Sequence, residues 1–197
     1  KQTKLPRPTQ NIIQIPDLLW TGAQLDTRPE ALALRDMAEK RKACILTKKA
    51  RALEGDAYLG RDERGLNTFK DAPFTLIEGH HMMSDAQAKR CAFIAKALAA
   101  YLNTAAPLAD APVLDGKDTR TFGDPYRPWE RTQHASDDPL AENIRRHHYS
   151  ATILQGVARD RDPEKKKFVL AGSPIELDGK PYPVKLWTLK ELRSFLE

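Results

Sequence analysis

The sequence has few cysteines and no long apolar run, and both features limit what the protein can be. Only two cysteines occur in 197 residues, Cys44 and Cys91, and each lies within a short apolar stretch. Both are expected to be buried free thiols, which suits a reducing compartment, although a single disulfide between them is also compatible with the sequence. No apolar stretch has the length of a membrane span, and no secretory signal is visible. We therefore expect a cytoplasmic protein with no membrane partner.

Two widespread catalytic motifs are also missing. The chain contains no Gly-x-Ser-x-Gly elbow of the serine hydrolases and no Gly-x-x-x-x-Gly-Lys-Ser/Thr loop for nucleotide phosphates. Cys91 belongs to an apolar helical stripe, which is the wrong environment for an activated thiolate. The sequence therefore gives little support to serine, thiol or P-loop chemistry.

What the chain has instead is an excess of basic residues. Lys and Arg number 32 against 27 Asp and Glu, which gives a formal net charge of +5 and an isoelectric point near 9.2. Such an excess favours contact with phosphates or acidic partners, although an ordinary solubilising charge would look the same. Hydrophobic residues make up 41% of the chain, which is enough to build the core of one domain of this length.

Proline positions and composition predict how the chain is organised. We expect an extended N-terminal arm over residues 1–25, because three prolines there favour extended backbone, and a single domain over residues 26–197. Within that domain, residues 104–137 are expected to form a long loop rich in Pro and Arg, and loops of this length are usually functional or disordered. The apolar segment 43–46 is compatible with a buried strand or with part of a helix.

Capping residues predict where helices begin. A Ser, Thr or Asp at a helix start can accept a hydrogen bond from the free amides of the first turn. The expected starts are Thr27 with Glu30, Ser84 with Gln87, Asp138-Pro139 (running to about residue 155) and Thr188 with Glu191. Strands are expected at 74–77 and 168–170, and a hairpin turn at Asp178-Gly179. We therefore predict an α+β fold, a compact domain with three to four helices and short β-hairpins.

All five histidines lie in three places: His80-His81, His134 and His147-His148. Neutral imidazole is the commonest transition-metal ligand, and its pKa near neutrality suits a general base. The pair His80-His81 follows an expected strand and precedes an expected helix. Adjacent side chains at a strand end point to opposite sides, so one imidazole could bind a metal while the other deprotonates a water. The alternative is one ring packed in the core and the other in solvent.

The sequence Gly79-His80-His81 resembles the motif of histidine-metal-finger (HNH-like) nucleases, particularly toxin domains with a Gly-His-His or Ala-His-His motif. The resemblance covers about ten residues. It implies that His80 is a metal ligand and that His81 is the general base. Those families take further ligands from a downstream His or Asn. Here the following helix contains no histidine, Asn103 lies at its end, and the remaining histidines come more than 50 residues later.

The second group of histidines is accompanied by carboxylates. His134, Asp138, Glu142 and His148 together would suit zinc, manganese or magnesium, depending on the share of oxygen ligands. Their spacing matches no recognised zinc signature. Asp138 also suits a helix N-cap and Glu142 a surface ion pair, and for both acids we favour the structural role. The expected ligands of a divalent metal are His80, His134 and His148.

The Pro/Arg-rich loop and the helix after it carry arginines close to aromatic residues. This combination suits phosphate binding and the stacking of single-stranded bases. It equally suits a loop that packs its aromatics on the domain and leaves its arginines in solvent. The residues expected to contact nucleic acid are Arg120, Arg127, Trp129, Arg131, Arg145 and Arg146.

Together these features predict a metal-dependent hydrolase of nucleic-acid phosphodiesters, such as a bacterial toxin or mobile-element domain, provided that the histidines converge on one pocket. Its partners would be nucleic acid and, for a toxin, a parent protein or a cognate inhibitor. The runner-up is a non-catalytic basic module that binds nucleic acid or an acidic protein. A third alternative, a nucleotide-dependent transferase toxin, has only Leu19-Trp20-Thr21-Gly22 in its favour, as the edge of a pocket.

Overall fold

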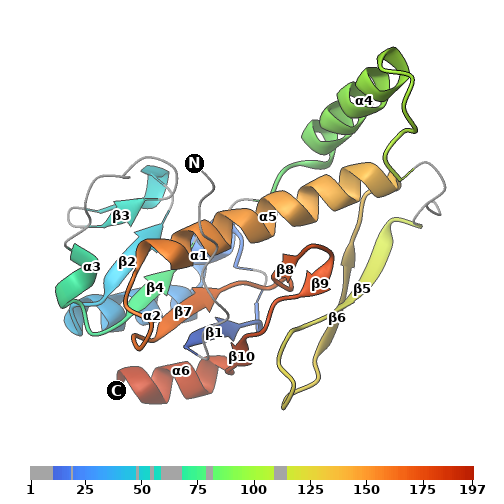
Figure 1. The fold of residues 1–197 in the computed structure, drawn as a ribbon. Coiled ribbons are helices and arrows are strands. Elements are labelled where there is room, and N and C mark those ends of the chain that lie inside the picture. Colours follow the sequence, from blue (N-terminus) through green and yellow to red (C-terminus); the bar gives the residue numbers. More distant parts are fainter. Residues whose placement is uncertain are drawn as a thin grey trace.

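The centre of the fold is a six-stranded sheet in which every neighbouring pair of strands is parallel (Figure 1). The computed structural model describes residues 11–18, 20–47, 49–53, 56–58, 68–78, 82–108 and 115–197. The strands, in their order across the sheet, are β10 (Lys185–Leu186), β1 (Ile12–Ile15), β7 (Lys167–Leu170), β4 (Thr75–Ile77), β2 (Cys44–Thr47) and β3 (Ala57–Tyr58). The fold contains helices, this sheet and separate hairpins, which confirms the predicted α+β class. The parallel pairing of the strands was not predicted from the sequence.

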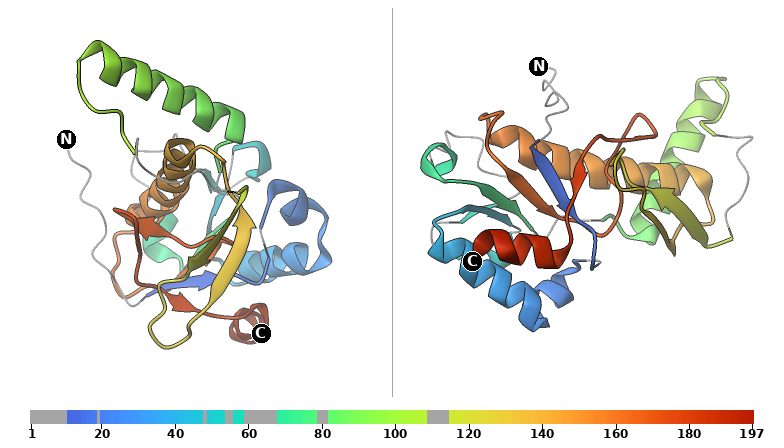
Figure 2. Two further views of the ribbon diagram at one scale, coloured as in Figure 1. Left: turned by 90° about the vertical axis from the view of Figure 1, so that its right-hand side faces the viewer. Right: turned by 90° about the horizontal axis from the view of Figure 1, so that it is seen from below.

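Helices cover both faces of the sheet (Figure 2). One face carries α1 (Gly22–Thr27), α2 (Pro29–Lys40) and α6 (Leu189–Leu196), and the other carries α5 (Pro139–Arg159). Two short elements, η1 (Lys49–Arg51) and α3 (Thr68–Asp71), complete this part of the chain. Parallel strands need crossover connections, and helices on both faces supply them.

Successive side chains of each strand enter two different cores. In β2, Cys44 and Leu46 belong to the core that contains Ile153 of α5, whereas Ile45 belongs to the core that contains Leu34 of α2. All four residues of β2 are therefore buried. A strand covered on both faces needs such continuous burial. The segment 43–46, which the sequence left open as strand or helix, therefore belongs to a buried strand, β2, from Cys44 onward.

Three elements lie outside the central sheet. They are helix α4 (Asp85–Tyr101), the hairpin of β5 (Lys117–Thr121) with β6 (Glu130–His134), and the hairpin of β8 (Glu176–Leu177) with β9 (Lys180–Pro181). Figure 1 shows α4 standing away from the sheet, with α5 between them. Asp178 and Gly179 have φ of 51° and 73°, which confirms the predicted hairpin turn. Among the described helices, none is both long enough and apolar enough to cross a membrane.

Three of the four predicted helix starts are confirmed. The Ser84/Gln87 and Thr188/Glu191 capping boxes are both formed, and Asp138 accepts hydrogen bonds from two amides of the first turn of α5. The start at Thr27 is wrong. Thr27 instead ends α1, which begins at its own capping box on Thr21, and α2 begins at Pro29 without a side-chain cap.

Three further expectations are corrected. In the expected arm over residues 1–25, residues 12–15 form β1 inside the sheet and residues 22–25 belong to α1, so this described part is not an extended arm; residues 1–10 and Leu19 lie outside the described residues. The segment 104–137 contains the β5–β6 hairpin. Its strands alternate between exposed and partly buried polar residues and so lack the apolar pattern of a strand. Cys44 is a buried free thiol as predicted, but the free thiol of Cys91 is exposed, because α4 packs through a different side.

Candidate functional site

The residues after β4 follow a central strand at its carboxyl end. Open parallel sheets bind their ligands outside the carboxyl ends of the strands, so this edge is where a site is expected. The amide of Glu78 donates to the carbonyl of Leu46 at 2.9 Å, which extends the pairing of β4 with β2 by one residue. The next residues are Gly79, His80 and His81, which lie outside the described residues. The predicted metal ligand His80 and general base His81 therefore follow β4 in the chain at its carboxyl end, where a site is expected.

A buried ionic cluster surrounds Glu78. Its side chain is 1% exposed and its Oε1 accepts a hydrogen bond from Arg35 of α2. The guanidinium of Arg51 lies 3.7 Å from the same oxygen. Arg35 also pairs with Asp56 and, at 3.0 Å, with Glu39. This cluster fastens the end of β4 to the helix that covers it.

The charges of the cluster keep Arg35 ionised. Burial lowers the pKa of its guanidinium, but the neighbouring Glu78 and Asp56 carboxylates outweigh that effect, so the pKa is raised above its ordinary value. A buried carboxylate with two guanidinium partners is a well-compensated group. Glu78 therefore has a structural role at the end of β4, and its Oε1 is already bound by Arg35.

Two polar groups beside Glu78 are left without partners. Thr47 ends β2 on the same face as Glu78, because Leu46 pairs with Ile77 and side chains alternate along both strands. Thr47 is fully buried, and Arg51 follows it in η1. Among the residues that the structure describes, neither the Thr47 hydroxyl nor Nε of Arg51 has a hydrogen-bond partner. Buried polar groups are nearly always satisfied in native proteins, so these two suit a water or a polar ligand at this edge.

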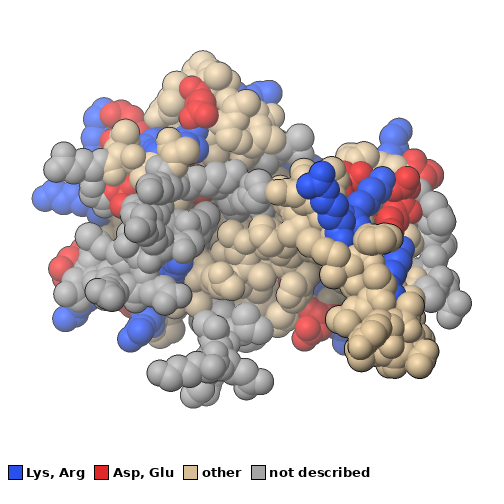
Figure 3. Space-filling view, turned by 90° about the horizontal axis from the view of Figure 1, so that it is seen from above, with Lys and Arg blue, Asp and Glu red and all other residues tan. Residues whose placement is uncertain are grey.

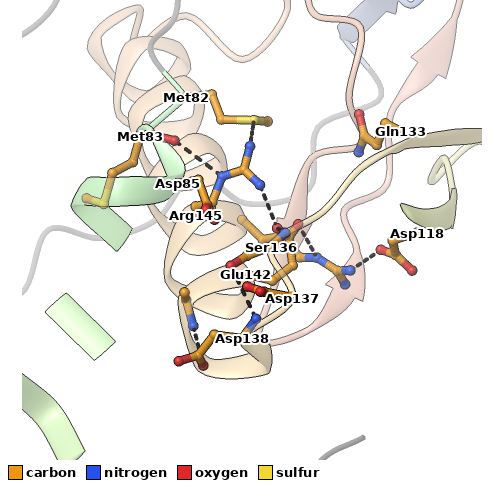
Figure 4. Close-up of polar contacts among 12 residues, drawn as sticks. Met82, Met83, Asp85, Asp118, Gln133, Ser136, Asp137, Asp138, Glu142 and Arg145 are labelled. Atoms are coloured by element: carbon orange, nitrogen blue, oxygen red, sulfur yellow. Dashed lines mark hydrogen bonds and ion pairs between the residues drawn. The ribbon is translucent and has the colours of Figure 1, made fainter. Parts of the chain in front are cut away.

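Helix α5 contacts the residues that follow Gly79-His80-His81 in the chain. Arg145 donates from Nε to the carbonyl of Met83 at 3.3 Å and from a terminal nitrogen to the sulfur of Met82 at 3.4 Å (Figure 4). His148 lies three residues further along α5 and is half-buried, whereas His147 is exposed. Positions three apart lie on the same side of a helix. Of the described histidines, His148 is thus tied most closely to the segment that contains His80 and His81.

Arg145 and Arg146 are held by Glu142, which is 3% exposed. The Glu142 carboxylate accepts from Arg145 at 2.8 Å, from Arg146 at 3.2 Å and from the amide of Ser136 at 2.8 Å. Arg146 also pairs with Asp118 of β5 (Figure 4). Glu142 is thus the structural group that was predicted, although it is buried rather than on the surface. Both arginines join α5 to its neighbours instead of pointing into solvent.

The arginines of the β5–β6 hairpin are also engaged within the protein. Arg120 is buried, 3.7 Å from both Asp118 and Glu176, and burial is the main reason that its pKa is lowered. Arg127 forms two hydrogen bonds to Glu191, at 2.7 and 2.8 Å.

The two remaining residues of the predicted nucleic-acid surface are similarly occupied. Arg131 donates to the carbonyl of Gly172 at 2.9 Å, after the end of β7. Trp129 is half-buried, and its ring centroid lies 6.3 Å from that of Phe122. The rings of Phe122 and Trp129 pack together as the packed-loop alternative expects, but Arg120 and Arg131 contact protein groups instead of standing in solvent.

The described histidines do not form a metal site by themselves. His134 is exposed at the end of β6, and it lies on a different element from His148. Within the described ranges, no three His, Cys, Asp or Glu side chains are grouped closely enough to share a metal ion. A three-ligand metal site of the predicted kind would therefore have to include His80 or His81.

The residues proposed for a nucleotide pocket have structural roles where they are described. Trp20 is buried and donates from its ring nitrogen to the carbonyl of Ile15 at 2.6 Å. Thr21 is the N-cap of α1. Leu19 lies outside the described residues.

The Glu78 cluster is the part of the site that sequence reasoning missed. Two signals for it are present in the sequence. Glu78 directly precedes Gly79-His80-His81, and the basic run that includes Arg51 directly follows a buried strand. Recognising them requires the knowledge that β2 and β4 are neighbours in a parallel sheet, because only then do both strand ends meet at one edge. Comparison of the chain with known protein families, with curated proteins and with solved structures finds no match.

Proposed function

We propose that the protein is a metal-dependent hydrolase of nucleic-acid phosphodiesters, with its reaction centre in the segment that follows β4. The observation that carries this proposal is the position of His80-His81, directly after a central strand at the carboxyl edge of a parallel sheet. The roles are those that the resemblance to histidine-metal-finger nucleases implies. His80 is a metal ligand, and His81 is the base that deprotonates the attacking water.

The neighbouring residues have distinct tasks in this proposal. The divalent ion, Mg²⁺, Mn²⁺ or Zn²⁺, stabilises the charge that develops on the phosphate. His148 is the second ligand, because Arg145, three residues before it, contacts Met82 and Met83. His134 has no part in the site.

The phosphate contact also differs from the one expected from sequence. The predicted Arg127, Arg131 and Arg145 have protein partners. Arg51 also pairs with Asp26 and Glu78 through its terminal nitrogens, but its Nε has no partner among the described residues. Arg51 follows β2, the strand next to β4, and is only 11% exposed in its side chain. We assign the substrate phosphate to Arg51. The net charge of +5 favours a polyanionic substrate.

The test is cleavage of supercoiled plasmid and of single-stranded RNA with each of the three metals, and with a chelator. We expect His81→Ala to lose at least about 100-fold in rate, the usual contribution of a general base. The matched control is His147→Ala, which removes an exposed histidine of α5 outside the site and should cleave like the unmodified protein. Cleavage that survives chelation, or equal rates in the two variants, would refute the proposal.

A second candidate function is a binding module without catalytic activity. It is favoured by the excess of Lys and Arg over Asp and Glu, 32 against 27, which suits binding without any catalytic group. Such a module would retain nucleic acid or an acidic protein in a salt-dependent way that a chelator does not change. Retention without cleavage under any of the metals would select this candidate over the hydrolase.

A further inference from the structure

Helix α4 packs with its small side chains inward and its large ones outward. Ala88 and Ala92 are fully buried against Leu140 and Ala141 of α5. The larger apolar residues of α4 face solvent instead, which is the reverse of the usual arrangement in a surface helix. A monomer therefore leaves apolar surface uncovered here.

Five of the exposed residues form one continuous stripe, and Phe93, which is also exposed, lies to one side of it. We call the group Cys91, Ile94, Leu98, Tyr101 and Leu102 the α4 stripe. Four of these side chains are between 54% and 84% exposed, and the thiol of Cys91 is exposed as well. Their steps of three, four and three residues from Cys91 to Tyr101 are the a and d spacing of a helix that pairs with another helix. On the right of Figure 3, the end of α4 stands out as a tan area beside basic side chains.

We propose that the α4 stripe is covered by the α4 stripe of a second copy of the chain, in an antiparallel pair with two-fold symmetry. In that arrangement Ile94 lies opposite Leu98, and Cys91 lies opposite Tyr101. Each large aromatic ring then meets a small side chain, so the stripe is complementary in shape to itself. A two-fold axis makes both contacts occur twice, as an isologous interface requires.

Charge also favours a second copy over an acidic or lipid surface. Antiparallel pairing brings Arg90 to the C-terminal end of the partner helix, where the negative end of the helix dipole favours a cation. The other basic residues of the helix are already used. Lys89 lies 3.0 Å from Asp85 and 2.6 Å from Asp137, and Lys96 lies 2.8 Å from Asp138. Each lysine therefore already has a carboxylate partner within its own chain.

The apolar area of the α4 stripe indicates how stable a dimer of this kind can be. Four large side chains that are more than half exposed offer roughly 500 Å² of apolar surface, which is within the range of functional patches. Two stripes together bury about 1,000 Å², the lower limit for a specific interface. We therefore expect a weak dimer whose population depends on protein concentration.

The first experiment measures mass by light scattering from about 5 to 200 µM protein, because association follows mass action. The mass of the unmodified chain should rise toward twice that of one copy. Leu98→Lys should weaken the dimer by at least about 30-fold, as expected for a residue at the centre of an interface. Leu53→Lys is the matched control, because Leu53 is 60% exposed but lies outside α4, and it should dimerise normally. Both substituted leucines are exposed, so thermal unfolding of the monomers should be unchanged.

The second experiment tests the antiparallel register. In Tyr101→Cys the new thiol should cross-link to Cys91 of the other copy under mild oxidation with diamide. Within one helix these positions are about 15 Å apart, too far for a disulfide. Tyr126→Cys is the control, because Tyr126 is 90% exposed outside α4 and should give no specific dimer.

Three outcomes would overturn the proposal. They are a monomer at every concentration, equal dimerisation of Leu98→Lys and Leu53→Lys, and equal cross-linking of the two cysteine variants. A monomer that sediments with anionic vesicles would assign the α4 stripe to a lipid surface instead. None of these outcomes depends on hydrolase activity.

Discussion

Replacing Glu142 with alanine should strongly destabilise the protein, because this carboxylate accepts three hydrogen bonds and joins α5 to the segment before it. It accepts hydrogen bonds from Arg145 and Arg146 on its own helix and from the amide of Ser136 in the segment before α5. The Glu142 and Arg145 side chains are only 4% and 9% exposed. Glu142→Ala therefore leaves a buried guanidinium without its counter-charge.

The expected loss follows from these contacts. Breaking a buried ion pair by removing one partner costs about 3 to 5 kcal/mol. Arg146 adds little, because its side chain is 25% exposed and keeps its partner Asp118. The amide of Ser136 adds part of the ~1 to 3 kcal/mol cost of an unsatisfied buried donor. We expect a total loss of about 4 kcal/mol, and about half of that for Glu142→Gln, whose amide oxygen can still accept from Ser136.

Urea unfolding followed by circular dichroism measures this loss as a shift of the midpoint at constant slope. Glu130→Ala is the matched control, because Glu130 is an exposed residue of β6, and its removal should change stability by less than about 0.5 kcal/mol. A loss below about 1 kcal/mol in Glu142→Ala would show that α5 is not held by this carboxylate.

Two further changes test the packing and the electrostatics of the fold. A Cβ at Gly123 would lie 1.9 Å from the carbonyl oxygen of Tyr182. Gly123→Ala should therefore lower the free energy of unfolding by about 2 kcal/mol or more, measured in urea. The control is Gly22→Ala, where nothing lies within 4 Å of the added Cβ, and it should be neutral or slightly stabilising. Hydrogen bonds from Arg127 are the main cause that lowers the pKa of Glu191 to about 2. The stability that this pair contributes is therefore present above the unfolded pKa of about 4.3 and is lost as the pH falls toward 2. Glu191→Gln should lower the free energy of unfolding by less than about 1 kcal/mol at pH 7, because the pair is solvent-exposed. Near pH 2 the variant should be as stable as the unmodified protein. A difference in stability that persists at pH 2 would contradict this assignment.

The helix starts at Ser84, Asp138 and Thr188 could be predicted because a cap is a local feature. Each depends on a side chain and an amide two or three residues apart, and the sequence displays both together. The Asp178-Gly179 turn was predictable for the same reason, since its conformation depends on those residues alone.

The strand order and the partners of the arginines could not be predicted, because both depend on residues far apart in the chain. Glu78 meets Arg35 across 43 positions, and Arg127 meets Glu191 across 64. A sequence shows that an arginine is present, but it does not show whether a carboxylate has already bound it. The α4 stripe shows the same limit, because its partner cannot be read from its own spacing. Its spacing indicates a helix that pairs through this side, but α5 covers the alanines instead.

The proposed hydrolase requires a metal site in the segment after β4, and calorimetric titration with Mn²⁺ detects such a site. The measurement compares the unmodified chain with His80→Ala and His134→Ala, and thermal unfolding verifies that all three are folded. We predict one site in the unmodified chain, an affinity lowered at least about 100-fold in His80→Ala, and no change in His134→Ala. Identical titrations for all three proteins, or a loss of binding only in His134→Ala, would contradict the account.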